Sequence, residues 1–383
     1  MIFRANIIDE KKISFDKAEI YTFRTLTSKY FFQDGTTNKA YNKVPLEKFV
    51  KLYDSDGNFA MVNCTNHMAN LILPQILTKE TLTYKEWYDK LYWSVRNMNF
   101  NSREASEVGI FDLAVHGIFA QKEKMSLHRF LGAKKDKVKV YASGISCYSS
   151  DDDIIEETKE YVNENYHCIK MKVGTNFGRD MTRDIERVKL VREVIGKDRK
   201  LFVDANQAWN WKEALEFAEK IKEFDIEWFE EPINTFDYNG FKNLCAHSPI
   251  KISTGECFSC AHSFEPLVES GVQHFQPIPA KIMSVGDWFH VRDLAQKNNI
   301  VMSSGGYSQI SAAFIATIDG EGENEGLTEW LLARRRPLNK YFKLAPKYKN
   351  GYFTLPENHG LPLLLDLEKL ENDGLISNIE YFK

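Results

Sequence analysis

Short β-rich runs recur along most of this chain, and a longer helical stretch follows each of them. The strand-like runs are 139–142, 168–173, 201–205, 227–230, 252–256, 274–276, 300–303 and, more weakly, 327–330. Strands that alternate with helices form parallel sheets, and eight such units suit a closed (β/α) barrel. An open Rossmann sheet is the alternative, but no GxGxxG motif follows an early strand.

The residues before the first unit have a different rhythm. Residues 17–24 and 46–53 are strand-like, and the turn-forming sequence 54–58 predicts a hairpin after the second run. Helical periodicity follows, and its last run, 106–122, predicts a buried helix. Strand and turn signals return after the eighth unit, in 351–383. A chain of 383 residues is long enough for a barrel and a smaller partner.

The composition excludes several function classes. A net charge of −4, with acidic and basic residues mixed along the chain, gives no reason to expect nucleic acid or an anionic membrane as partner. No apolar run approaches membrane-spanning length, and the N-terminus lacks the apolar core of a signal peptide. The six cysteines are too scattered for a disulfide framework, which favours reduced thiols in the cytoplasm. Cys257 and Cys260 form one CxxC, but no second pair follows, so the pattern does not match a zinc site.

Carboxylates stand at the ends of three consecutive predicted strands, where a barrel builds its active site. Asp204 to Glu230 and Glu230 to Glu256 are both steps of 26 residues. Each step is one β/α repeat, so the three side chains are expected at the same level on adjacent strands. Three hard oxygen ligands around one point predict a Mg²⁺ site with positions left for substrate or water.

Two lysines on the preceding strand complete the pattern. Lys170 and Lys172 are two residues apart, so both side chains point the same way, while Ile169, Met171 and Val173 face the helices. Ammonium groups buried in the barrel mouth are expected to have lowered pKa values. A lysine with a lowered pKa suits a general base.

These motifs together resemble the mandelate racemase and muconate lactonising branch of the enolase superfamily. The likeness at the site rests on KMK at 170–172, VDANQ at 203–207, FEEP at 229–232 and TGE at 254–256. Outside the site, 106–132 is similar to the family's last capping helix and its exit. Residues 352–361 are similar to its C-terminal return segment.

The resemblance implies an α/β fold with a modified (β/α)₇β barrel. Residues 138–350 would form the barrel and 1–137 an α+β capping domain, to which the segment 351–383 would return. It also implies a homo-oligomer and a small-molecule carboxylate as substrate.

The resemblance also assigns roles. Asp204, Glu230 and Glu256 would bind Mg²⁺, Lys172 would be the base, and Lys170 would help neutralise the substrate carboxylate. Removal of an α-proton from a carboxylate makes an enediolate with two negative charges on one group. A divalent cation and an ammonium offset that charge where it develops.

Two positions depart from the family pattern. In the racemase group a histidine ends strand seven and an aspartate ends strand six, and in the lactonising group a lysine takes the strand-six place. Here Ile278 and Gly305 stand at these positions, so the usual catalyst on the opposite face is absent. The replacements that the sequence offers are Lys281 and Tyr307 as catalytic groups, and Ser304 and Glu329 near the substrate.

A single clear base favours a lyase, and the predicted reaction is dehydration of a sugar acid to a 2-keto-3-deoxy acid. Cycloisomerisation stays open, racemisation or epimerisation requires a second base, and a catalytically impaired metal-binding paralogue would not require Lys172. Asn206 and Glu231 are candidates for supporting positions around the metal. The substrate is expected to be set by capping loops within 25–41 and near Asn58, and the polar first loop suits a polyhydroxylated acid.

Overall fold

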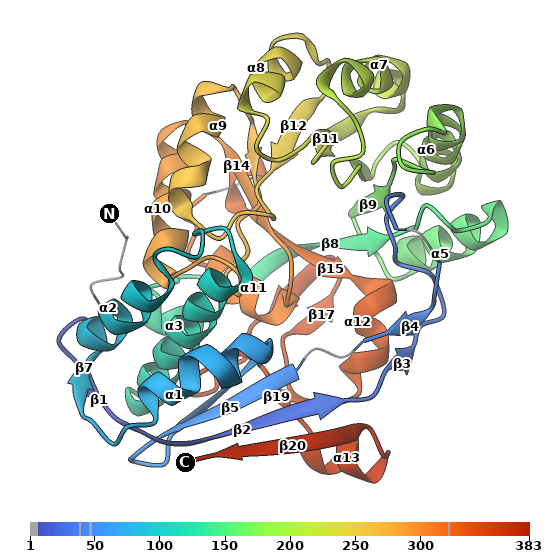
Figure 1. The fold of residues 1–383 in the computed structure, drawn as a ribbon. Coiled ribbons are helices and arrows are strands. Elements are labelled where there is room, and N and C mark those ends of the chain that lie inside the picture. The colour runs from blue at the N-terminus through green and yellow to red at the C-terminus, as the bar shows by residue number, and fades with distance from the viewer. Residues whose placement is uncertain (1–6, 38–39, 46–47, 321) are drawn as a thin grey trace.

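The strands predicted from the repeats form one closed ring. In the computed structural model, which describes residues 7–37, 40–45, 48–320 and 322–383, neighbouring strands pair in parallel in chain order, and the last strand pairs with the first (Figure 1). The barrel strands are β8 (Lys137–Gly144), β9 (Cys168–Lys172), β10 (Lys200–Asp204), β11 (Ile226–Glu230), β12 (Lys251–Thr254), β13 (His274–Phe275), β14 (Val301–Ser304) and β15 (Leu327–Leu331). The predicted parallel barrel is confirmed, and the open sheet is excluded.

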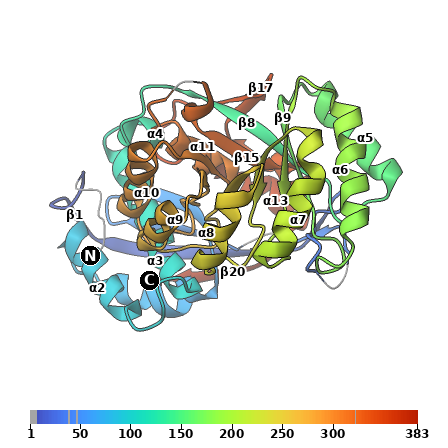
Figure 2. The same ribbon diagram turned by 90° about the horizontal axis from the view of Figure 1, so that it is seen from above.

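Helices surround the ring on its outer side (Figures 1 and 2). They follow the strands in turn as α5 (Asp151–Asn163), α6 (Met181–Ile195), α7 (Trp211–Ile221), α8 (Tyr238–His247), α9 (Glu265–Glu269), α10 (Val285–Lys297), α11 (Ser308–Ile315) and α12 (Leu332–Asn339). Ser150 begins α5 with a capping box, in which its side chain accepts from the Asp153 amide and the Asp153 carboxylate accepts from the Ser150 amide. Within the described ranges, no helix is both long and apolar enough to cross a bilayer.

The N-terminal part is a cap of mixed α and β structure. Its elements are β1 (Lys12–Ile13), β2 (Phe15–Phe23), β3 (Leu26–Thr27), β4 (Lys43–Val44), β5 (Lys48–Asp54), β6 (Phe59–Cys64), α1 (Leu73–Ile76), β7 (Leu82–Thr83), α2 (Tyr84–Val95), α3 (Arg103–Lys122) and α4 (Leu127–Phe130). The predicted hairpin joins β5 to β6, and Oδ1 of Asp54 accepts from the amides of Asp56 and Asn58 at 3.0 and 2.8 Å. Residues 46–47 of the predicted strand lie outside the described residues.

Helix α3 confirms the predicted buried helix and joins the cap to the barrel. Its side chains are buried along nearly the whole length. Gly109 allows a close approach, since a Cβ there would lie 1.9 Å from the carbonyl oxygen of Ile282 in the barrel. On the cap side, the ring of Phe111 meets that of Phe15 edge-on, with 5.5 Å between centroids. The helix therefore belongs to the core of both parts.

The C-terminal segment touches both parts of the molecule. Its elements are β16 (Phe342–Leu344), β17 (Lys347–Lys349), β18 (Tyr352–Thr354), β19 (Leu364–Leu365), α13 (Leu367–Asn372) and β20 (Ile376–Phe382). Strand β18 pairs antiparallel with β8 of the barrel, and β20 pairs antiparallel with β2 of the cap. The cap sheet thus has the order β20–β2–β5–β6. The domain boundaries at residues 137 and 350 stay predictions.

An aromatic layer fills the barrel beneath the predicted site. Phe202 and Trp228 stack with 3.3 Å between ring centroids, and Tyr141 meets both rings edge-on. Each of the first two residues lies two positions before a predicted metal ligand, Asp204 or Glu230, and so points to the same side of its strand. A layer of packed aromatic rings therefore lies directly beneath the carboxylates.

Truncation of the buried ring in α3 tests this shared core. Phe111→Ala is expected to lower the free energy of unfolding by about 3–5 kcal/mol, because it leaves a cavity in the core on the cap side of α3, where the ring packs against Phe15. Tyr381→Ala, at a side chain that is 70% exposed, should change it by less than about 0.5 kcal/mol. Chemical denaturation measures both. Equal stability of the Phe111→Ala variant and the wild-type chain would show that the packing of α3 on the cap side does not stabilise the fold.

Candidate active site

Strand register brings the predicted lysines and carboxylates to one edge of the barrel. Lys172 at the end of β9 lies beside Asp204 at the end of β10, and Asp204 lies beside Glu230 at the end of β11. Glu256 comes two residues after the end of the next strand, β12. Four neighbouring strands therefore place two ammonium groups and three carboxylates at the carboxyl end of the barrel, where barrel enzymes carry their chemistry.

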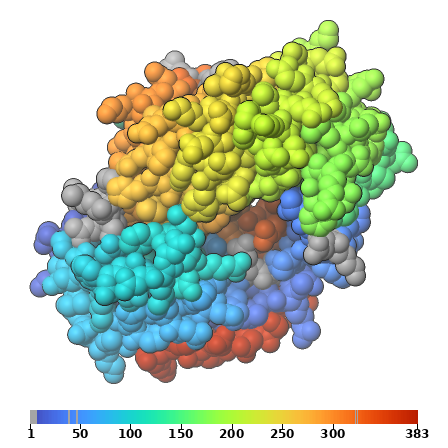
Figure 3. All heavy atoms as spheres, turned by 45° about the horizontal axis from the view of Figure 1, so that its top comes forward, coloured from blue at the N-terminus to red at the C-terminus, as the bar shows by residue number. Residues whose placement is uncertain are grey.

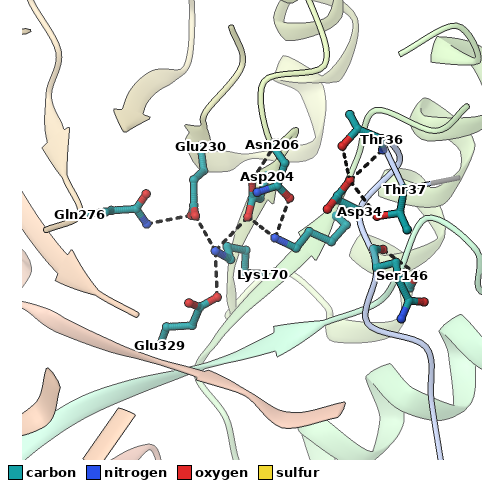
Figure 4. A network of polar contacts seen from close by, with 12 residues as sticks. Asp34, Thr36, Thr37, Ser146, Lys170, Asp204, Asn206, Glu230, Gln276 and Glu329 are labelled. Atoms are coloured by element: carbon teal, nitrogen blue, oxygen red, sulfur yellow. Dashed lines mark hydrogen bonds and ion pairs between the residues drawn. The ribbon is translucent and has the colours of Figure 1, made fainter. Parts of the chain in front are cut away.

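Lys170 is the centre of the ion pairs at this edge (Figure 4). Its Nζ lies 2.6 Å from Oε1 of Glu230, 2.9 Å from Oε1 of Glu329 and 3.1 Å from Oδ2 of Asp204. The lysine is 1% exposed, and its three partners are buried as well. Burial lowers the pKa of Lys170, but the three carboxylates outweigh burial and hold the pKa well above its ordinary value. Lys170 therefore carries a fixed positive charge.

Lys172 reaches the same aspartate. Its Nζ donates to Oδ2 of Asp204 at 2.5 Å and to Oδ1 of Asn206 at 2.8 Å. Burial lowers the pKa of Lys172, but Asp204 raises it, and the net pKa is above its ordinary value. The expectation of lowered pKa values is wrong for both lysines, because the neighbouring carboxylates outweigh the loss of hydration.

The carboxylates repel one another in a largely buried site. Burial raises the pKa of Asp204, but Lys170 and Lys172 hold it below its usual range. Burial and the charge of Asp204 raise the pKa of Glu230 well above its usual value, and they raise that of Glu256 as well. A divalent cation stabilises such a group of carboxylates more strongly than a single ammonium group does.

The donor set fits Mg²⁺ in its chemistry. Asp204, Glu230 and Glu256 offer carboxylate oxygens from three adjacent strands, and Mg²⁺ prefers oxygen ligands. Their oxygens do not all lie within 4.8 Å of one another, and Nζ of Lys170 lies within 3.1 Å of both Asp204 and Glu230. A cation held by all three carboxylates therefore requires the lysines to turn aside from Asp204.

The backbone behind the carboxylates is left-handed at residues other than glycine. Asn206, Gln207 and Glu231 have φ values of 43°, 67° and 37°. Such conformations cost about 1–3 kcal/mol each and persist where the surroundings over-determine them. Here the amide of Gln207 donates to the carbonyl oxygen of Glu231 at 2.7 Å. The side-chain Oε1 of Gln207 accepts from the amide of Thr235 at 3.0 Å. The turns after β10 and β11 therefore brace each other.

A cavity of about 330 Å³ lies between the strand ends and a loop of the cap, and a hollow is visible where cap and barrel meet (Figure 3). From the barrel, its lining includes Lys172, Asn206, Glu256, Ile278, Lys281 and Glu329. From the predicted substrate loop it includes Phe32, Gln33, Asp34, Thr37 and Tyr41. The carbonyl oxygen of Gln33 accepts from Oγ of Ser146 at 2.7 Å, which ties this loop to the end of β8. Residues 38–39 of the loop lie outside the described residues.

Glu329 takes the space that a side chain at position 305 would need. A Cβ on Gly305 would lie 2.3 Å from Oε2 of Glu329. Ile278 packs over the next glycine, since a Cβ on Gly306 would lie 2.8 Å from its Cγ2. The strand-seven histidine and the strand-six polar residue are thus replaced by a carboxylate from β15 and an apolar side chain.

Lys281 connects two carboxylate-bearing turns. Its Nζ donates to the backbone carbonyl oxygen of Glu256 at 2.7 Å, and its charge acts on Glu231. Burial and the charge of Glu256 raise the pKa of Glu231 to about 8. Lys281 is therefore both part of the cavity wall and a support for the turn that carries Glu256.

Ser304 and Tyr307 are not among the described residues that line the cavity. Oγ of Ser304 donates to the carbonyl oxygen of Pro277 at 2.8 Å and so joins β14 to the loop after β13. The ring of Tyr307 meets that of Phe49 of the cap edge-on, at 5.3 Å between centroids, and the guanidinium of Arg335 lies 4.1 Å from its centre. Both side chains hold elements together around the site.

Two arginines in the cavity wall were missed by the sequence reasoning. Arg334 and Arg335 line the cavity from the start of α12, and Arg335 donates to the carbonyl oxygen of Gly306 at 2.7 Å. The signal that points to them is the run of three arginines three residues after the end of the eighth strand, within α12. The third, Arg336, instead pairs with Glu160 of α5 at 2.5 Å.

Comparison with known proteins decides the family. A sequence model described as enolase C-terminal domain-like matches residues 153–369, which is more than half of the chain. The chain belongs to this family. The predicted resemblance to the enolase superfamily is therefore confirmed.

Characterised relatives extend the likeness. L-talarate/galactarate dehydratase of Salmonella typhimurium (strain LT2) is 25% identical over 299 residues, or 78% of this chain and 72% of that protein. Arabinonate dehydratase of Saccharolobus solfataricus is 29% identical over 301 residues, or 76% of this chain and 78% of that protein. The crystal structure of the S. typhimurium dehydratase with Mg and L-lyxarohydroxamate matches with a TM-score of 0.81 at 20% identity, and covers 100% of this chain and 97% of that one. This match confirms the predicted fold of a barrel with a capping domain.

Removal of a ligand carboxylate tests the metal assignment. Asp204→Asn and Glu230→Gln are each expected to weaken Mg²⁺ binding by at least about tenfold, because each removes a charged oxygen donor. Isothermal titration with Mg²⁺ measures the affinity. Glu329→Gln is the matched control, since Glu329 contacts Lys170 but is not a predicted ligand. A larger loss in the Glu329→Gln variant than in the Asp204→Asn variant would contradict the ligand set.

Proposed function

We propose that the chain is a Mg²⁺-dependent enzyme that removes the proton α to a carboxylate, and that its reaction is dehydration of a sugar acid to a 2-keto-3-deoxy acid. The observation that carries this proposal is the position of Lys172. Its side chain lines the cavity beneath the cap loop and contacts Asp204 and Asn206. A base at this place faces a small molecule whose carboxylate is held at the strand ends.

The relatives support the substrate class. Two proteins that match about three quarters of the chain are named as dehydratases of the acids talarate, galactarate and arabinonate. The cavity wall supports it too, because Asp34 and Thr37 offer hydrogen-bonding groups to hydroxyls and Arg334 offers a cation to an acid.

Each residue has a distinct task in this proposal. Mg²⁺ held by Asp204, Glu230 and Glu256 would supply the positive charge that stabilises the doubly charged enediolate. Lys170 keeps its proton and adds a second positive charge beside the carboxylate. Lys172 must give up its proton before it can act as base. Its proton is easier to remove when Asp204 binds Mg²⁺ in place of the Lys172 ammonium, because the lysine then loses the negative charge that stabilises its protonated form.

Departure of the β-hydroxyl requires a proton donor. Of the catalytic groups predicted from the sequence, Lys281 lines the cavity, whereas Tyr307 packs between cap and barrel. We therefore assign the donor role to Lys281 and a positioning role to Tyr307. Glu329 would position Lys170, and Asn206 would position Lys172, through the contacts that they make.

A screen of acid sugars with Mg²⁺ tests the function. We expect formation of a 2-keto acid from at least one of them, together with deuterium uptake from heavy water at the α-carbon. Lys172→Ala should abolish both, and Lys281→Ala should lower keto-acid formation while exchange continues. Normal α-proton exchange by the Lys172→Ala variant would refute the assignment of the base.

The stereochemistry of exchange tests whether one base acts alone. Because Ile278 and Gly305 replace the usual second catalysts, the proton should return to the face that it left. Nuclear magnetic resonance of the recovered substrate should therefore show exchange with retention at C2. Interconversion of two C2 epimers would reveal a second base and favour the epimerase alternative.

We also propose that the protein works as a homo-oligomer in the cytoplasm, which follows from the family resemblance and the cysteine usage. Light scattering at micromolar concentration should give the mass of two or more chains of 44.4 kDa each. A monomer mass would overturn the proposed assembly.

A further inference from the structure

A second group of metal-ligating side chains lies beside the predicted Mg²⁺ site. One carboxylate oxygen of Glu231, one of Glu256 and Sγ of Cys257 all lie within 4.8 Å of one another. In the part of the chain that the structure describes, no other three His, Cys, Asp or Glu side chains come this close. Metal bonds of about 2.0–2.3 Å place the donors of one ion roughly 3.5 Å apart. Small side-chain shifts therefore suffice to close this group around an ion.

Glu231 supplies an independent sign that a cation belongs here. The residue is 1% exposed, and its Oε1 has no hydrogen-bond partner in the described structure. A buried carboxylate oxygen without a partner is costly, and a cation removes that cost. The nearby ammonium of Lys281 does not fill this role, because it donates to the backbone oxygen of Glu256 and leaves Oε1 of Glu231 without a partner.

The sulfur of Cys257 is held in place for a ligand. Nε2 of Gln207 donates to Sγ at 3.3 Å. Gln207 itself is fixed, since its amide donates to the carbonyl oxygen of Glu231 and its Oε1 accepts from the amide of Thr235. An amide that donates to sulfur orients the ligand.

We infer that Glu231, Glu256 and Cys257 bind a thiophilic divalent cation of the Zn²⁺ class. Two carboxylates and a sulfur suit Zn²⁺, whereas Mg²⁺ prefers oxygen alone. When the metal–sulfur bond forms, the thiol proton leaves to solvent, so that binding releases one proton. Three protein ligands leave a fourth position for water.

The soft cation competes with Mg²⁺ because Glu256 belongs to both ligand sets. An ion that holds Glu256 against Glu231 and Cys257 withdraws it from Asp204 and Glu230. We therefore expect Zn²⁺ to inhibit turnover, a consequence that rests on the proposed function, whereas binding itself does not.

Cadmium binding tests the site directly. We expect the reduced full-length protein to bind one Cd²⁺ with an ultraviolet thiolate-to-metal charge-transfer band. Cys257→Ser should abolish the band and weaken Cd²⁺ binding at least tenfold, while Cys260→Ser, the matched control from the same CxxC, should keep both. Glu231→Gln should weaken Cd²⁺ binding with the band retained at saturation. A band that persists in Cys257→Ser, or Cd²⁺ binding without a band, would overturn the site.

Inhibition provides the second readout. Zn²⁺ should inhibit the Mg²⁺-dependent reaction of the wild-type chain, and Cys257→Ser should require at least tenfold more Zn²⁺, each relative to its own uninhibited rate. If Cd²⁺ binds as expected but Zn²⁺ does not inhibit, the competition is refuted and the site stands. If no acid sugar turns over, the proposed function fails while the cadmium result still decides the site.

Discussion

The buried ammonium of Lys170 is the charge around which the carboxyl end of the barrel is arranged. It contacts Asp204, Glu230 and Glu329 within 3.1 Å, in a place that water hardly reaches. A buried charge is tolerated only when it is paired and hydrogen-bonded. The three carboxylates and the lysine therefore depend on one another, and loss of the ammonium would leave uncompensated negative charge in the core.

The layer beneath makes this arrangement effective. Phe202 and Trp228 stack one layer below the carboxylates and close that side of the site with apolar rings, which strengthens the interactions among the charges. Nε2 of Gln276 donates to Oε2 of Glu230 at 2.8 Å and fixes the side of that carboxylate that faces away from Lys170. The left-handed backbone at Asn206 and Glu231 then sets the direction in which the chain leaves β10 and β11. The packed aromatic layer inside the barrel thus supports the strained turns and the buried charges at its carboxyl end.

Much of this architecture is readable from the sequence. The eight repeats predict the barrel, because alternation of strand and helix leaves few other folds, and the 26-residue steps predict that Asp204, Glu230 and Glu256 gather at one edge. The alternation around Lys170 and Lys172 predicts which way both lysines point.

Other features depend on three-dimensional neighbours and are not readable from spacing. The pKa values of the two lysines follow from carboxylates on other strands. Gly305 is explained only by Glu329, which comes from the next strand and fills the space above it. The proposed site at Cys257 is likewise not readable from spacing. A lone CxxC argues against a zinc site, but folding brings Glu231 and Glu256 from two strand ends close to the sulfur of Cys257.

The most direct test of this account is where a hard divalent cation binds. Mn²⁺, which accepts the same oxygen ligands as Mg²⁺, can be located in crystals by anomalous diffraction. The account predicts one peak within bonding distance of Asp204, Glu230 and Glu256, with the ammonium of Lys172 turned away from Asp204. A peak elsewhere, or one that Asp204 and Glu230 do not contact, would contradict it.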